Sequence, residues 1–179
     1  MPNSWVLFTY KVPPEPAKKR VAMWRRLKGL GAVYLNNGVC LLPKTDEHLR
    51  HLKIMENDVS GMGGEAVLLE TIGLDHGQED KVMTRFRQDR DAEYREFIDK
   101  CADFERELCR ETKHNGFTYA ELEESDADLN KLQTWLEKIK KLDFYAAPLR
   151  DDAERRFREC QAKLESYAQR VFDSHDENK

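Results

Sequence analysis

The side chains best placed to bind a ligand form a basic cluster near the start of the chain. Its members are Lys18, Lys19, Arg20, Arg25, Arg26 and Lys28. Lysine attracts phosphates and oxyanions as a point charge, and arginine adds a bidentate hydrogen-bonding fork. We therefore treat these six residues as candidates for binding DNA phosphate or an oxyanion. The alternative is a solvated helix face that forms ion pairs with acidic helices later in the chain.

A second basic group, Arg85, Arg87 and Arg90, lies among acidic neighbours. Basic and acidic side chains three or four positions apart on a helix pair with one another. We expect these three arginines to form an intrahelical ion-pair array rather than a binding site.

Other chemistry has little support in the residue pattern. His48 and His51 share a helix face, but no third ligand follows at a recognisable spacing, so we expect surface histidines and no metal site. The cysteines lie far apart and should be reduced thiols, with Cys40, Cys101 and Cys109 packing as small core residues. No catalytic triad order, phosphate loop or nucleophile elbow is present. We predict no enzyme, no catalytic residue and no cofactor.

The elements that position these side chains are predicted from two kinds of hydrophobic pattern, one in residues 1–75 and one in residues 76–179. Residues 1–75 alternate strand-like and helical segments, with an Asn36-Asn37-Gly38 hairpin turn and a stop at Pro13-Pro14. We predict strands at 4–12, 32–35, 39–42 and 65–74, and helices at 17–30 and 45–62. This order is a ferredoxin-like βαββαβ unit in an α+β protein.

The first predicted helix carries an apolar stripe at Val21, Trp24 and Leu27. A tryptophan on such a stripe usually packs inside, so we expect Trp24, like Trp5, to lie in the core. For the second helix, Thr45 or Asp46 is the expected N-cap. The two helices should cover one sheet face, which leaves the other face to be buried by something else.

Residues 76–179 change to a helical period. Apolar residues recur at helical spacing over 79–112, 118–142 and 150–173, with breaks at His114-Asn115-Gly116 and Ala147-Pro148. We predict an antiparallel three-helix region. The last six residues, 174–179, should form a polar, disordered tail.

The composition fits a soluble cytoplasmic protein. Residues 1–74 hold ten basic and seven acidic residues (net +3), and the remainder holds 20 and 27 (net −7). The overall net charge of −4 argues against a generally basic nucleic-acid binder. No segment has the pattern of a signal peptide or the length of a membrane span.

Several motifs resemble the N-terminal domain of the chromate-resistance regulator ChrB. They are Trp5, the run 21–32 (VAMWRRLKGLGA), Asn37-Gly38-Val39 with Leu42-Pro43, and 63–66 (GGEA), with weaker likeness at Phe86, Tyr94 and 142–144. The resemblance implies a role in chromate resistance through transcription regulation. Full-length members of that family carry a further C-terminal domain of comparable size, and we expect this chain to lack its sensor or enzymatic role.

A similar β-α-β-β arrangement occurs in the central domain of the PaaX repressors and in a small CRISPR adaptation nuclease. In that nuclease family an aspartate near the end of the first strand binds the metal, whereas this sequence has Lys11 there. Because lysine cannot ligate a hard metal ion as a carboxylate does, we expect no nuclease of this type.

Two functional hypotheses follow. The first is a ChrB-type regulatory protein that binds DNA or chromate through the basic helix. The second is a non-catalytic, dimeric protein-interaction module in which the basic helix is only solvated surface. We expect a homodimer, because the small sheet has one uncovered face and pairing with a second copy would bury it.

Overall fold

The computed structural model describes residues 3–176, which divide into two compact units. The first contains the chain up to Asp89 together with Leu142–Tyr145, and the second contains Arg90–Lys141 and the chain from Ala146 onward. The boundary expected near residue 75 therefore lies inside the first unit. The reason is that the opening turns of the long third helix pack with the sheet rather than with the other helices.

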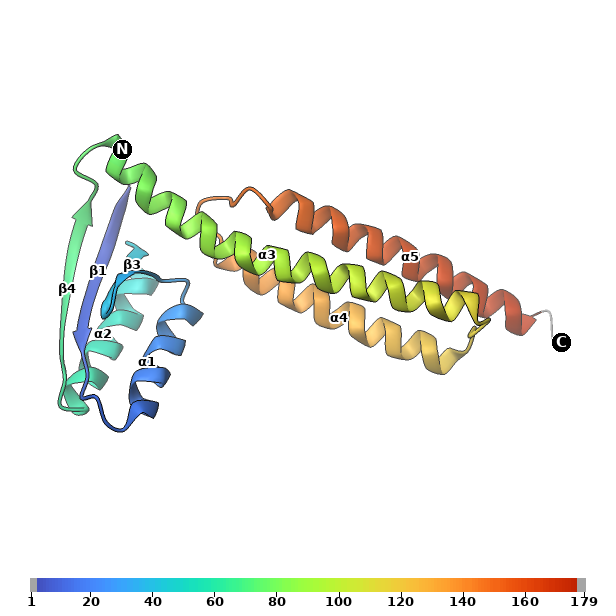
Figure 1. Ribbon diagram of the computed structural model, residues 1–179, viewed down its shortest axis with the longest axis horizontal. Helices are drawn as coiled ribbons and strands as arrows, with labels where there is room; N and C mark the ends of the chain where they lie inside the picture. Colours follow the sequence, from blue (N-terminus) through green and yellow to red (C-terminus); the bar gives the residue numbers. More distant parts are fainter. Residues whose placement is uncertain (1–2, 177–179) are drawn as a thin grey trace. The chain divides into compact units, whose positions relative to one another are not determined.

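The first unit is the predicted ferredoxin-like fold. Its elements are β1 (Ser4–Lys11), α1 (Ala17–Gly29), β2 (Val33–Asn36), β3 (Val39–Pro43), α2 (Asp46–Gly61) and β4 (Glu65–Ile72). The strands form one antiparallel sheet in the order β2-β3-β1-β4 (Figure 1). As expected, Thr45 caps α2, where its Oγ1 accepts a hydrogen bond of 3.0 Å from the backbone N–H of His48.

Helix α1 buries a face that overlaps only partly with the predicted stripe, because Leu27 is buried as predicted but Val21 and Trp24 are not. Met23 and Leu27, four positions apart, are fully buried against the sheet. Trp24 is 50% exposed and Val21 is 44% exposed, so the prediction of a buried Trp24 was wrong. Trp5 is buried as predicted. Turning the helix so that Met23 faces inward places the adjacent Trp24 about 100° away, at the edge of the packed surface.

The second sheet face is only partly covered. Phe86 from α3 (His76–Lys113) packs there with Trp5, Val33 and Leu41, and the 142–145 segment adds its aromatic rings. Val67 and Leu69 on β4 remain 51% and 54% exposed. The chain itself therefore supplies part of the cover that the sequence required, and the β4 side of the face stays open.

The second unit is the predicted three-helix region. It consists of α3 from Arg90 onward, α4 (Tyr119–Lys141) and α5 (Arg150–Asp176), which enclose their own apolar core. Asn115 and Ala146 adopt left-handed backbone angles at the two breaks. Helix α5 continues through Asp176, so the first half of the expected disordered tail is helical, and residues 177–179 lie outside the described part.

Two further predictions concern the membrane and the thiols. Within residues 3–176, no helix combines the length and apolarity needed to span a bilayer. Cys40, Cys101 and Cys160 are buried, but Cys109 is exposed, so its predicted core position was wrong. Eight helical positions separate Cys109 from Cys101, a rotation of about 80°, which takes Cys109 off the buried stripe. The expected cytoplasmic location stays a prediction.

Candidate anion-binding site

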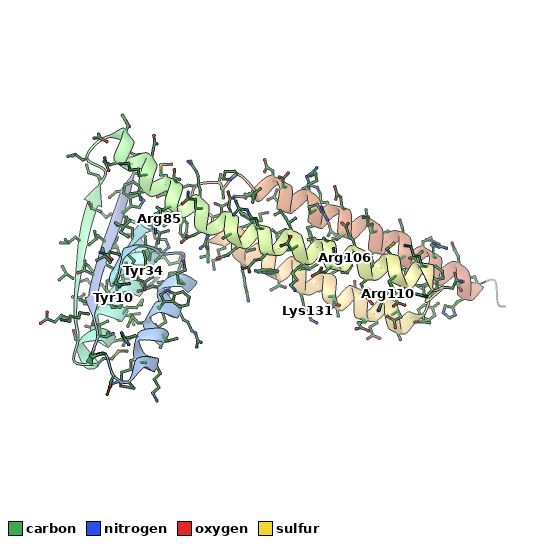
Figure 2. The ribbon with its side chains drawn as sticks, viewed as in Figure 1. Tyr10, Tyr34, Arg85, Arg106, Arg110 and Lys131 are labelled. Atoms are coloured by element: carbon green, nitrogen blue, oxygen red, sulfur yellow. The ribbon has the colours of Figure 1, made fainter. Side chains whose placement is uncertain are left out.

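The first unit contains a polar hollow of about 720 Å³, which we call the cationic hollow. Four segments line it: the end of β1, helix α1, the β2–β3 turn and the opening turns of α3. The charged and aromatic side chains of its lining are Tyr10, Lys11, Arg20, Trp24, Lys28, Tyr34, Arg85 and Asp89. Figure 2 shows Tyr10, Tyr34 and Arg85 following one another across this unit.

The hollow has an excess of positive charge. Its lining holds four cationic side chains and one carboxylate, a difference of three charges. Lys28 Nζ lies 3.1 Å from Asp89 Oδ2, and Arg85 Nη2 donates a 2.6 Å hydrogen bond to the backbone oxygen of Tyr34. Within residues 3–176, the side chains of Lys11 and Arg20 have no hydrogen bond or ion pair. Two unpartnered cations beside two anchored ones are suited to an anionic ligand.

Two tyrosine hydroxyls add neutral hydrogen-bond donors. The Tyr10 and Tyr34 oxygens lie 2.7 Å apart, so one hydroxyl donates to the other. Burial raises the pKa of both side chains above the usual tyrosine value, and for Tyr34 the hydrogen bond with Tyr10 raises it further. Both hydroxyls therefore stay protonated at neutral pH. Because one shared hydrogen bond uses one of two protons, the second proton is available to a ligand.

The turn at the base of the hollow is held tightly against β1. Gly38 has φ = 69°, a backbone conformation that favours glycine, and its backbone oxygen accepts a 2.8 Å hydrogen bond from Tyr10 N–H. A Cβ atom at this position would collide with the backbone oxygen of Tyr10. The Asn36-Asn37-Gly38 motif thus does more than reverse the chain, because it also fixes Tyr34 relative to Tyr10.

Only part of the predicted basic cluster lines the hollow. Arg20 and Lys28 do; they lie eight positions apart on one face of α1, with Trp24 midway between them. Arg26 instead pairs with Asp58 of α2 at 2.6 Å. The other three members, Lys18, Lys19 and Arg25, lie elsewhere on α1 and are not part of the lining.

Sequence reasoning missed Lys11 and Arg85 as site residues. In the sequence, Lys11 argues only against a metal ligand. Its place at the end of a central strand is the signal that could have indicated an anion-binding side chain. The intrahelical array was wrong for Arg85 and for Arg87, whose Nε donates to the backbone oxygen of Tyr145 at 2.9 Å. Arg90 does form an intrahelical pair, with Glu93 at 3.2 Å. Packing of α3 on the sheet brings strand and loop carbonyls within reach of the first two arginines.

The histidine pair does not behave as predicted either. His48 is buried rather than exposed, its Nδ1 lies 2.7 Å from the backbone oxygen of Pro43, and its ring meets the edge of Phe144. These contacts give the His48 ring a role in packing rather than in binding a metal. No cluster of three or more potential metal ligands occurs in the part of the chain that the structure describes.

The fold and the hollow define a class of protein: a ferredoxin-like α+β unit with a cationic surface hollow, followed in the same chain by a three-helix unit. Comparison with known proteins identifies the family of the chain. It belongs to the ChrB N-terminal family, whose model, described as "Protein ChrB, N-terminal", matches residues 20–178. The resemblance inferred from the motifs is thereby confirmed.

A curated relative is Protein ChrB of Cupriavidus metallidurans. It is 29% identical over 96 residues, which cover 54% of this chain and 29% of the relative's length. The match therefore reaches less than a third of that protein. No solved structure matches the chain.

Proposed function

We propose that this chain is a regulatory protein associated with chromate resistance, and that the cationic hollow binds the oxyanionic group of its effector. Membership of the ChrB N-terminal family supports the regulatory, non-catalytic role. The observation that carries the binding proposal is the pair of unpartnered cations, Lys11 and Arg20, in a lining with three excess positive charges. Chromate, sulfate and phosphate groups all have the oxygen geometry and charge that such a lining attracts.

The residues have distinct roles in this proposal. Arg20 and Lys11 donate charge-assisted hydrogen bonds to the oxyanion, and the free proton of the tyrosine pair supplies a neutral one. Arg85 stays on the Tyr34 carbonyl and contributes its charge without moving. The bound group thus links β1 and α1, two segments that the chain otherwise joins through a loop, and stabilises this unit by mass action.

Binding of chromate, sulfate and phosphate, measured by equilibrium dialysis at low salt, tests the proposal. A Lys11→Ala/Arg20→Ala variant should bind at least about a hundredfold more weakly, since each of the two lost hydrogen bonds to a charged group contributes about 1.5–3 kcal/mol. The matched control is Lys18→Ala/Arg25→Ala, which removes the same charge from residues outside the hollow and should bind as the wild type does. Equal weakening in both variants would indicate general attraction to the protein and contradict a site.

DNA binding is the second candidate function. The exposed residues Lys18 and Arg25 on α1 favour it, since neither is part of the hollow and both are free to contact phosphates. Their effect would differ from that of a hollow ligand, because contacts to DNA phosphate depend steeply on salt.

Pairing of two copies through β4 is our proposal for the assembly. β4 lies at the edge of the sheet with eight residues, and its open face carries the half-exposed Val67 and Leu69. The opposite edge strand, β2, has four residues and an irregular register, which protects an edge from pairing. Glu70 of β4 is neutralised by Lys44 at 2.9 Å, so a second copy of the strand can approach without strong like-charge repulsion.

Sedimentation equilibrium tests the pairing. Leu69→Lys places a charge on the proposed contact and should give a monomer at concentrations where the wild type is dimeric. Ile54→Lys is the control, because Ile54 is 51% exposed and belongs to α2, which packs on the other face of the sheet from Leu69. A monomeric wild type at high protein concentration contradicts the dimer, and with it the alternative of a dimeric interaction module.

A further inference from the structure

One face of α1 indicates which class of ligand the cationic hollow can bind. Arg20, Trp24 and Lys28 lie at intervals of four residues on α1, and all three line the hollow. Side chains at this spacing are neighbours on the helix surface, with steps of about 6 Å along the axis. The face thus presents an aromatic ring between two cations. Trp24 is 50% exposed, in contrast to the fully buried Trp5, so folding leaves much of its indole uncovered.

The hollow is several times larger than an inorganic oxyanion. An ion such as phosphate has five heavy atoms, and at about 30 Å³ each, the share of one water molecule, it fills roughly 150 Å³ or less. The hollow measures about 720 Å³. Its volume lies within the range of about 300 to 1,000 Å³ that is typical of sites for small organic ligands.

We infer that the hollow binds a nucleotide, whose base stacks on Trp24 while its phosphate is held by Arg20 and Lys11. This inference rests on the proposed function and specifies the carrier of the oxyanionic group. Every base has a π-face, so stacking on an exposed aromatic ring combined with a cationic groove is how proteins hold nucleotides without reading sequence. The protonated hydroxyls of Tyr10 and Tyr34 lie at the same hollow and supply hydrogen bonds to the sugar or base.

Titration of the full chain with AMP and its fragments tests the inference. Ribose 5-phosphate lacks the base, adenosine lacks the phosphate, and inorganic phosphate lacks both. We expect AMP to bind at least tenfold more tightly than each fragment and to quench tryptophan fluorescence. Trp24→Ala should abolish that advantage over ribose 5-phosphate while leaving ribose 5-phosphate binding unchanged. Trp24→Phe should restore most of it, and the exposed neighbour Arg25→Ala is the control.

The outcomes separate this inference from the proposed function. Equal binding of AMP and ribose 5-phosphate, or of AMP to the wild type and Trp24→Ala, overturns the nucleotide and leaves the oxyanion site intact. Absence of binding for every anion overturns both. A short single-stranded oligonucleotide that binds more tightly than AMP, with the same dependence on Trp24, supports the inference and identifies nucleic acid as the source of the nucleotide.

Discussion

Replacing each of two tryptophans in the first unit separates the observed helix orientation from the one that the sequence pattern favours. Trp5 is 1% exposed, packs with Val33, Leu41 and Phe86, and donates a 2.8 Å hydrogen bond from Nε1 to the Tyr145 hydroxyl. Trp5→Ala should therefore destabilise the unit by roughly 3–5 kcal/mol through cavity formation. The hydroxyl left without its donor adds about 1 kcal/mol.

Trp24→Ala should cost much less. Half of the Trp24 side chain is already in water, so its removal loses only part of the burial energy, about 1 kcal/mol. Had the Val21, Trp24 and Leu27 stripe been the buried face, the same substitution would cost as much as Trp5→Ala.

Urea unfolding followed by fluorescence measures both costs. Trp135 belongs to the second unit, and a Trp135→Phe background removes its signal. Trp24 then reports on the Trp5→Ala variant, and Trp5 reports on the Trp24→Ala variant. The fluorescence must come from a tryptophan of the first unit, because two compact units need not unfold in a single transition. Equal losses for the two variants would refute the observed orientation of α1.

Three other outcomes can be checked. A thiol reagent at pH 8 should modify the exposed Cys109 first and Cys40 slowly, since burial raises the pKa of Cys40 to about 12 and keeps it a thiol; equal rates would contradict this. Burial also raises the pKa of Tyr34, so its contribution to stability should be complete below pH 10 and decrease as the pH rises further. Tyr34→Phe should weaken this loss in alkaline urea titrations. If DNA binds, Arg25→Ala should reduce the salt slope by about one unit, whereas Arg26→Ala should change it less because Arg26 is paired with Asp58; equal changes would place DNA elsewhere.

The sequence by itself determined the order and the ends of the elements. Pro13-Pro14 ends a strand, Asn36-Asn37-Gly38 reverses the chain, and Thr45 caps a helix, all through interactions within a few residues. Short-range signals of this kind act wherever the chain later packs, which is why the ferredoxin-like unit, the three helices and the family could be predicted.

Only the tertiary structure decided which side chains meet in the hollow. The basic cluster was visible in the sequence, but just Arg20 and Lys28 reach the site, and Arg85 joins them through a bond to a carbonyl 51 positions away. The observed orientation of α1 buries Met23, whereas the sequence pattern had favoured the adjacent Trp24. The physical reason is that a helix with several apolar residues has more than one face it can bury, and the packing partners supplied by distant strands select among them.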